Sequence, residues 1–551
     1  MKIITNRSRY SVSKRSIAAI ILVCALIAGI LLGHFGIVNM LQASWQNALL
    51  RWTAQNESQS IPLLIVDMPF ENYNLILSQR QEALQKGFIA SSETSFVTAD
   101  LRFGAEIIPV RMQLQSGLAQ HLGDDDKWNF EVVTRDNQQV LDQTRFNLID
   151  PADNNWLWEW AYMEALRKEG LPAANYQFVR LFLNGDDRGI YAMQESFGSL
   201  FPGYDGRQSG PIVAYDVQPL LETAAYFGGD IEAAIADPST NLTLNNPQFV
   251  GVDTNPDPLI ADDEQLSTQM NQATAFLRAL QRGDVAASEG FDVAQYGRFL
   301  ALADLWGAAG TLSPLNLTYY FNPQSGRLEP LSMNGNPMAT SGRISHEATY
   351  QDPLIQAAYI RATADFSDPD YLVELEKDLN PQLERLEQAL RVETGQSPIW
   401  PQLAQRQEQL RLSLQPAQPI IAYLDSSEWV QEGILQVKVA NVLNLPLEVL
   451  GFNIDGATFL EADPAWIIAG QDYVALDGGK VILNAVPSGA LGGLAFVSFN
   501  LPMQEIIKQD QELQFLSEIE ITIATRIPGL EEKQLTPAGA GLPASLNNDT
   551  R

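Results

Sequence analysis

The feature that most constrains this chain is an uninterrupted apolar run near its start. From Ile17 to Met40 the sequence contains no Asp, Glu, Lys or Arg. A helix of this length rises about 36 Å, at about 1.5 Å per residue, whereas the hydrocarbon core of a bilayer is about 30 Å thick. The run therefore predicts a transmembrane helix over residues 16–40.

The charges around this run predict its orientation. The run is preceded by five basic residues: Lys2, Arg7, Arg9, Lys14 and Arg15. The first acidic residue is Glu57. Because basic flanks are retained in the cytoplasm, we expect a single-pass protein of the cell membrane with a cytoplasmic N-terminus. The alternative is a cleaved signal peptide, whose apolar region is usually about 7–15 residues long. In both cases the bulk of the chain is extracytoplasmic.

The exported part is strongly acidic. Of 35 Lys and Arg residues, removal of the five in the tail leaves 30, against 66 Asp and Glu residues, so its net charge is about −36. Such a surface repels nucleic acid and anionic lipid headgroups. We therefore expect no nucleic-acid partner, and we attribute the charge to solubility outside the membrane.

Cysteine and histidine are too scarce for several kinds of site. The single cysteine, Cys24, lies inside the apolar run, so no disulfide can form within the exported part. The histidines are His34, His121 and His346, too few for a credible His/Cys zinc site. No G-x-S-x-G or G-x-x-x-x-G-K-[ST] motif occurs, which excludes the common hydrolase and P-loop sites.

Hydrophobic patterns divide the exported part into an α+β domain and an all-β module. Alternating runs predict strands between residues 62 and 148, and a helix follows Asp153 and ends at Gly170. The Asn-Gly turn at Asn184 predicts a hairpin, and a second hairpin surrounds the turn at Pro323.

The later part of the α+β domain is predicted to be largely helical. We expect helices over 265–283 and 293–309, and two amphipathic helices between residues 371 and 414. From residue 419 onward, short strand-like runs separated by Gly, Asp and Pro predict a β-sandwich. The predicted organisation is a cytoplasmic basic tail (1–15), a transmembrane helix (16–40), a juxtamembrane connector (41–61), an α+β domain (62–415), a β-sandwich-like module (416–536) and a disordered tail (537–551).

One segment has partial calcium-loop spacing. Asp253, Asn255, Asp257 and Glu264 occupy positions 1, 3, 5 and 12 of an EF-hand loop. However, Pro258 stands where the loop needs Gly, and its ring fixes φ near about −65°. We therefore interpret this segment as an acidic surface loop, and the run Asp124–Asp126 as a solvated turn.

The α+β domain resembles the spore-coat CotH kinase-like family, whose members have a divergent protein-kinase-type fold. The resemblance covers about residues 62–415, and its most specific motif is the hairpin L-N-G-x-x-x-G-I-Y-x-x-x-E. The matching segments are DKWNFEV (126–132), RFNLIDPADNNWLWEWAYMEALRKEGLP (145–172), FVRLFLNGDDRGIYAMQESF (178–197), NLTYYFNPQSGRLEPL (316–331) and SMNGNP (332–337).

The resemblance implies candidate binding residues for ATP and Mg²⁺. Lys127 matches the lysine that holds the nucleotide phosphates, and Glu195 matches the acidic residue expected to pair with it. Asn316 matches a metal-coordinating asparagine that is also part of the nucleotide site. A Lys and a Glu on neighbouring strands can also form a plain surface pair worth about 0–1 kcal/mol.

The departures from the family pattern predict a degenerate catalytic site. Asn334 stands where the family has a metal-binding Asp, so Mg²⁺ binding should be weak or lost. The stretch before Asn316 contains no catalytic base, and Asp304 is the nearest acidic residue on that side. We therefore expect a membrane-anchored pseudokinase that binds a nucleotide or a protein partner. The alternatives are an active exported Ser/Thr kinase that uses ATP and Mg²⁺ on protein substrates, and a non-enzymatic adhesive surface protein.

Overall fold

The structure is a computed structural model, and it describes most of the chain after residue 60. The described ranges are 61–89, 92–123, 127–203, 206–228, 251–252, 258–313, 315–338, 352–394, 398–425, 435–456, 458–468, 473–476, 479–486, 494–502 and 520–541. Contacts divide the chain into two units, Met1–Pro62 with Pro381–Ser397, and Leu63–Asn380 with Pro398–Arg551. The barrel, the second sheet, the pocket and the C-terminal sheets described below all belong to the second unit.

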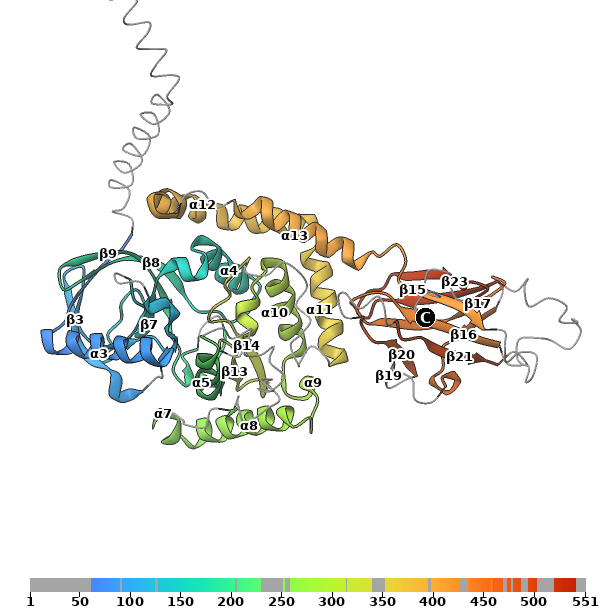
Figure 1. Ribbon diagram of the computed structural model, residues 1–551, viewed down its shortest axis with the longest axis horizontal. Coiled ribbons are helices and arrows are strands. Elements are labelled where there is room, and N and C mark those ends of the chain that lie inside the picture. Colours follow the sequence, from blue (N-terminus) through green and yellow to red (C-terminus); the bar gives the residue numbers. More distant parts are fainter. Residues whose placement is uncertain are drawn as a thin grey trace, which may run out of the picture. The chain divides into compact units, whose positions relative to one another are not determined.

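Seven strands form a closed barrel in the order β1-β3-β4-β6-β7-β9-β8 (Figure 1). The barrel strands are β1 (Leu63–Asp67), β3 (Val97–Phe103), β4 (Glu106–Leu114), β6 (Phe130–Thr134), β7 (Arg145–Ile149), β8 (Tyr176–Leu183) and β9 (Asp186–Glu195). Neighbouring strands are antiparallel, except that β1 and β8 pair in parallel. This last pairing closes the sheet and leaves it without free edges.

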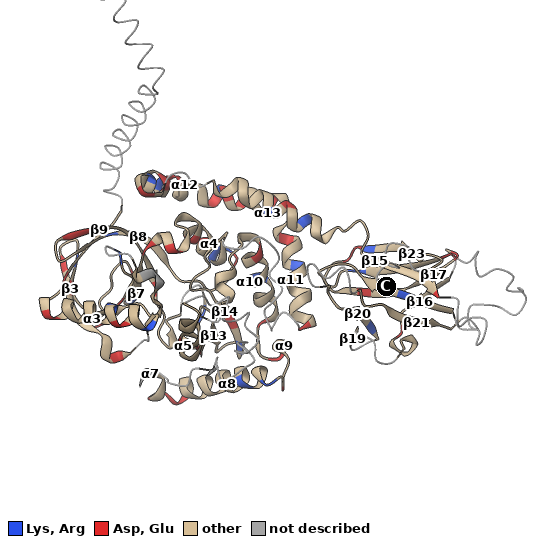
Figure 2. Ribbon diagram, viewed as in Figure 1, with Lys and Arg blue, Asp and Glu red and all other residues tan. Residues whose placement is uncertain are grey.

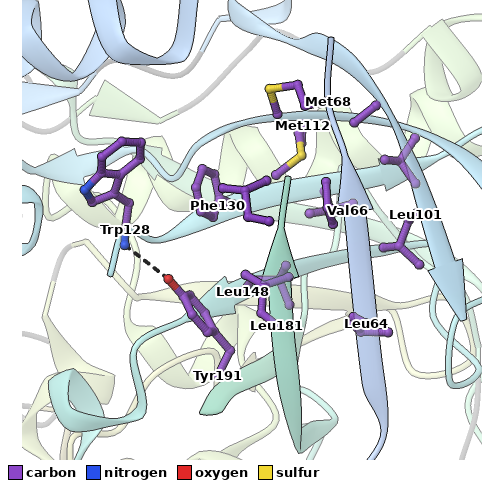
Figure 3. Packing of buried hydrophobic residues seen from close by; sticks show 14 of the residues in the cluster. Leu64, Val66, Met68, Leu101, Met112, Trp128, Phe130, Leu148, Leu181 and Tyr191 are labelled. Carbon is purple, nitrogen blue, oxygen red and sulfur yellow. Dashed lines mark hydrogen bonds between the residues drawn. The ribbon is translucent and has the colours of Figure 1, made fainter. Parts of the chain in front are cut away.

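The barrel is filled by side chains that alternate along its strands. In β3, Val97, Ala99 and Leu101 are buried while the residues between them are exposed, which is the two-residue period of a strand with one buried face. Leu64, Leu148 and other apolar residues from several strands meet in the same interior (Figure 3). The barrel is therefore a packed core and not a channel.

The hairpin β8–β9 turns at Asn184 and Gly185. Both residues have positive φ, 52° and 89°, as the tight two-residue turn of a hairpin requires. The Asn184 side chain also accepts a hydrogen bond of 2.6 Å from the backbone N–H of Met68 at the end of β1. The turn thus helps to hold β8 beside β1.

Four short elements and one helix accompany the barrel. Helix α3 (Phe70–Lys86) follows β1 and buries only Ile76 and Ala83. The short elements are β2 (Phe88–Ile89), η2 (Glu93–Ser95), β5 (Gly117–Leu118) and η3 (Ala119–Leu122).

A second sheet follows the barrel in sequence, and so do most of the helices. The first two helices given below, η4 and α4, lie between β7 and β8. This sheet has the order β10-β11-β13-β14, and β12 pairs with β11. Its strands are β10 (Leu200–Phe201), β11 (Gly210–Asp216), β12 (Gly251–Val252), β13 (Thr318–Asn322) and β14 (Arg327–Leu331). The helices are η4 (Pro151–Asn154), α4 (Leu157–Lys168), α5 (Gln218–Tyr226), α7 (Pro258–Ala261), α8 (Glu264–Gln281), α9 (Ala287–Gly290), α10 (Val293–Trp306), η5 (Ala309–Leu312), α11 (Pro353–Phe366), α12 (Pro369–Thr394) and α13 (Ile399–Leu414).

The C-terminal part forms two antiparallel sheets. One has the order β15-β16-β21, and the other has the order β19-β20-β17-β22-β23 with β18 beside β17. The elements are β15 (Ile420–Asp425), β16 (Leu435–Asn441), β17 (Leu447–Ile454), β18 (Thr458–Glu461), η7 (Pro464–Trp466), β19 (Tyr473–Leu476), β20 (Lys480–Leu483), β21 (Val497–Leu501), β22 (Ile521–Arg526) and β23 (Lys533–Pro537). Phe452 of β17 and Phe499 of β21 pack with ring centroids 5.0 Å apart, which joins the two sheets.

The fold class predicted from the sequence is wrong. The chain is α+β, but its domain begins with a closed seven-stranded barrel and not with the predicted kinase-like architecture. Alternation identifies the strands, but it does not show that β1 pairs with β8. The predicted transmembrane helix at 16–40 lies outside the described residues. Among those described, no helix is both long enough and apolar enough to cross a membrane.

Candidate functional site

Asn316 and Asn334 flank the same hairpin. Asn316 precedes β13, Asn334 follows β14, and the two strands pair antiparallel with Thr318 opposite Leu331. The start of β13 and the end of β14 therefore lie at one end of the hairpin. The side-chain nitrogen of Asn316 donates a hydrogen bond of 2.9 Å to the carbonyl of Gly310. This bond fixes the amide and turns its oxygen away from that carbonyl.

The two asparagines line one cavity of about 490 Å³, which we call the amide pocket. This volume falls in the range of about 300–1,000 Å³ that is usual for small-molecule sites. Its lining consists of Gln115, Ser116, Gly117, Leu118, Asn129, Ile149, Asp153, Asn154, Val217, Leu221, Leu315, Asn316 and Asn334. Five of these residues carry side-chain amides, and five others are aliphatic.

The barrel and the segment after β7 supply a second polar wall of the pocket. Asn129 lies just before β6, and Asp153 and Asn154 belong to η4. The Nδ2 of Asn129 donates 2.9 Å to the Asp153 carboxylate, while its Oδ1 accepts 2.7 Å from the backbone N–H of Asp150. These bonds hold Asp153, the one charged residue in the described lining, at the pocket.

Two buried amide atoms of the lining have no hydrogen-bond partner among the described residues. They are the Nδ2 of Asn154 and the Oδ1 of Asn334. A buried polar group without a partner costs about 1–3 kcal/mol. One donor and one acceptor beside the pocket are therefore unsatisfied among the described residues, and both atoms are buried and not exposed to the cavity.

Lys127 lies close to the amide pocket but is not one of its lining residues. Its ammonium is 3.4 Å from the carboxylate of Asp150 and donates to the carbonyl of Ile190 at 3.1 Å. The rings of Trp156 and Tyr191 lie 5.6 and 5.8 Å from the same nitrogen. These contacts hold the ammonium group in place.

Glu195 ends β9 and is likewise not part of the lining. Its carboxylate accepts a hydrogen bond of 3.2 Å from the backbone N–H of Asn175, next to the start of β8. The carboxylate found 3.4 Å from Lys127 is that of Asp150. The structure thus brings Asn316 and Asn334 together, but it does not place Lys127 or Glu195 with them in the cavity wall.

A buried carboxyl group lies behind the segment that carries Asn334. Glu159 of α4 is fully buried, and its two oxygens accept hydrogen bonds from the backbone N–H groups of Gly335 and Asn336. Burial raises the pKa of Glu159 to about 8, although the two hydrogen bonds act in the opposite direction. Burial and the proximity of Glu159 also raise the pKa of Tyr162 and that of Tyr176 well above the usual value for tyrosine.

The other acidic candidates do not form a metal centre in the part of the chain that the structure describes. Within it, no three His, Cys, Asp or Glu residues are grouped so as to hold a metal ion. Asp253, Asn255 and Asp257 of the calcium-like segment, and the run 124–126, lie outside the described residues. Glu264 is the first residue of α8. Across the described elements, acidic and basic residues are interspersed (Figure 2).

Asp304 has a structural role inside the helical part. It is fully buried in α10, accepts a hydrogen bond of 2.6 Å from the Tyr359 hydroxyl and lies 3.5 Å from the Arg406 guanidinium. Arg406 also donates to the backbone carbonyl of Leu305 at 2.9 Å. These contacts occupy the carboxylate in the packing of α10, α11 and α13, so it is not available as a catalytic base.

No protein-family model matches the chain, and no curated protein matches it. The resemblance to the CotH kinase-like family therefore remains a prediction. Function is therefore inferred from the geometry of the amide pocket.

Proposed function

We propose that this protein is a non-catalytic binding protein whose amide pocket holds a nucleoside or nucleotide without a metal ion. The observation that carries the proposal is that Asn316 and Asn334 line one cavity of about 490 Å³. The proposal rests on the pocket and not on a kinase-like fold, because function must be argued from the site.

The lining supports a ligand with flat apolar faces and polar edges. Leu118, Ile149, Val217, Leu221 and Leu315 supply apolar surface in a cavity otherwise lined by amides. A nucleobase has such a character, since its faces stack on apolar groups and its edges carry hydrogen-bond donors and acceptors. Each amide offers a donor and an acceptor, so the wall can bind either kind of edge atom.

The charges of the lining support binding without metal or strong phosphate contacts. No Lys or Arg is among the described lining residues, and Asp153 is the one carboxylate. Mg²⁺ is usually held by one or two carboxylates together with substrate phosphates, whereas Asn334 offers a neutral oxygen. We therefore expect the base and the sugar to contribute most of the affinity.

Asp153 supports one alternative function, phosphoryl transfer. Its carboxylate lies at the pocket, where a base could accept the proton of a substrate hydroxyl. This alternative requires metal-dependent binding of ATP, which separates it from the proposed function. Asp304 does not support it, because that carboxylate is buried, accepts a hydrogen bond from Tyr359 and lies 3.5 Å from the Arg406 guanidinium.

The proposal includes a location at the cell membrane with the bulk of the chain outside the cytoplasm. It is supported by the basic residues before Ile17 and by the apolar run that follows them. Proteolysis of intact cells tests it, because an externally added protease should remove the C-terminal sheets without lysis. Protection of the whole chain until the cells are lysed would contradict it.

Calorimetric titration of the full-length protein in mild detergent tests the proposed function. The ligands are the common ribonucleosides, and ATP with and without Mg²⁺. We expect a nucleoside to bind, ATP to bind within about tenfold of it, and Mg²⁺ to change neither constant. Asn316→Ala should weaken binding, and Asn72→Ala, on α3 outside the lining, is the matched control.

Each other outcome has a definite meaning. If no nucleoside and no nucleotide binds, the proposed function is wrong. If ATP binds only with Mg²⁺, and Asp153→Asn abolishes that binding, the phosphoryl-transfer alternative is supported instead.

A further inference from the structure

Glu159 connects helix α4 to the segment that carries Asn334. Its Oε1 accepts a hydrogen bond of 2.7 Å from the backbone N–H of Gly335, and its Oε2 accepts one of 2.8 Å from that of Asn336. The two contacts join residues 176 and 177 positions apart in sequence. One side chain therefore fixes two successive peptide groups directly after Asn334.

The segment Ser332–Met338 is held in an unusual backbone conformation. Asn336 and Met338 have φ values of 45° and 63°, in the left-handed region that non-glycine residues rarely occupy. Each such residue costs of order 1–3 kcal/mol and persists where the surroundings hold it in place. The segment thus depends on its contacts with the rest of the domain.

Neighbouring elements form further hydrogen bonds with this segment. The three given next involve Met333, Pro337 and Met338, and not Gly335 or Asn336. Asn155 donates 3.1 Å to the carbonyl of Pro337, and Gln194 donates to the carbonyl of Met333. The backbone N–H of Met338 donates 3.0 Å to the carbonyl of Trp306. Glu159 is the residue that holds the two amides nearest to Asn334 on its C-terminal side.

Close packing leaves little room for another arrangement. A Cβ atom on Gly335 would lie 2.5 Å from the ring of Tyr162, which is one turn beyond Glu159 on α4. The backbone at Gly335 therefore lies directly against the helix. Loss of the Glu159 oxygens would leave the buried N–H of Gly335 and the partly buried N–H of Asn336 without acceptors, and an unsatisfied buried group costs about 1–3 kcal/mol.

We infer that Glu159 is a positioning residue for the amide pocket, which fixes the place of the Asn334 side chain through the backbone of Gly335 and Asn336. This inference rests on the proposed function. Glu159 does not line the cavity and so acts on the ligand through Asn334.

Glu159→Gln is the informative variant. Glutamine has nearly the same shape, but it offers one acceptor oxygen and replaces the other oxygen with a donor NH₂ group. One of the two amides then loses its acceptor while the packing of α4 is preserved. Glu164→Gln, on the same helix and partly exposed, is the matched control.

The first measurement is the affinity for the best-binding nucleoside in a double-mutant cycle with Asn334→Ala. In the full-length protein we expect Glu159→Gln to raise Kd about tenfold. The same change should have little effect when Asn334 is already alanine, because both act through one contact. Additive effects of the two changes, or an unchanged Kd in folded Glu159→Gln, would overturn the inference. A merely structural role would lower the melting temperature without this coupling.

The second measurement does not need a ligand. Amide hydrogen exchange of the peptide covering 332–338 should be faster in Glu159→Gln than in the wild type, and unchanged in Glu164→Gln. If the wild type binds no nucleoside, the proposed function fails, while faster exchange still supports the positioning contact. If Glu159→Gln does not fold, Glu159→Asp replaces it, since a side chain shorter by one methylene group cannot keep both hydrogen bonds at their lengths and should show the same coupling to Asn334. Unchanged exchange in the folded variant would overturn the inference.

Discussion

Asn129 and Asp153 are joined by a hydrogen bond of 2.9 Å between the side-chain nitrogen of the first and the carboxylate of the second. Asn129 lies at the start of a barrel strand, and Asp153 lies in the short helix that precedes α4. The same Asn129 side chain accepts from the backbone N–H of Asp150, whose carboxylate is 3.4 Å from Lys127. One amide therefore connects the pocket wall to the site of the lysine.

Asn129→Ala should weaken ligand binding. The substitution removes the donor that orients Asp153, and a hydrogen bond to a charged group is worth about 1.5–3 kcal/mol. We expect the Kd of the best-binding nucleoside to rise about tenfold or more in calorimetric titration. The control is Asn72→Ala. An unchanged Kd would mean that Asp153 does not need this bond, and that its wall of the pocket does not contact the ligand.

Glu159 should make the stability of the protein depend on pH. Its pKa is about 8 in the folded protein against an ordinary value of 4.5. Between these values the folded state keeps a proton that the unfolded state has lost, so a rise in pH favours unfolding. The stabilising contribution is fully present below about pH 4.5, is lost as pH rises to about 8, and changes no further above that. The loss is on the order of a few kcal/mol.

The pH dependence is measured by urea denaturation from pH 5 to pH 9 in the wild type and in Glu159→Gln. The difference between the two proteins isolates this carboxyl group from all other titrating residues. We expect the variant to gain stability relative to the wild type as pH rises, with the change complete near pH 9. Glu164→Gln serves as the control. A difference that stays constant over this range would mean that burial does not shift the pKa of Glu159.

The strands and turns of this fold could be predicted from local patterns, but the barrel could not. Alternation located β3 and β4, and the Asn-Gly pair located the turn between β8 and β9, because these signals lie within a few adjacent residues. Closure depends on the parallel pairing of β1 with β8, which are more than a hundred residues apart. Helix α3 gave no clear signal, because it buries only Ile76 and Ala83 and exposes Phe70.

The pocket could be predicted in part. The resemblance pointed to Asn316 and Asn334, and the pairing of β13 with β14 explains why they lie near each other. Asp153 gives no functional signal in the sequence, because Pro-Ala-Asp-Asn-Asn is typical of the start of a helix, where acidic residues are common for structural reasons. The contact of Glu159 with Gly335 links positions 176 residues apart, and no local pattern reports such a contact.

Gly335→Ala should destabilise the protein and disturb the pocket. The added Cβ would lie 2.5 Å from the ring of Tyr162, closer than such contacts allow, so the segment or the ring must move. Overpacking of this kind typically costs about 1–3 kcal/mol. A shift of the urea midpoint at constant slope measures the loss. Gly541→Ala is the control, because a Cβ there meets nothing within 4 Å and no unusual φ is involved. Wild-type stability in Gly335→Ala would show that the segment has room to adjust.

Variants of Asp304 test whether its carboxylate has a structural or a catalytic role. It accepts 2.6 Å from Tyr359 and lies 3.5 Å from Arg406, and all three residues are buried. Asp304→Ala leaves the guanidinium buried without its charged partner, which typically costs about 3–5 kcal/mol. Asp304→Asn keeps an acceptor for the Tyr359 hydroxyl and should cost less. We therefore expect the urea midpoint to be highest in the wild type, lower in Asp304→Asn and lowest in Asp304→Ala. Both variants, where folded, should bind the nucleoside with the Kd of the wild type. Loss of binding at unchanged stability would instead assign Asp304 to the functional site.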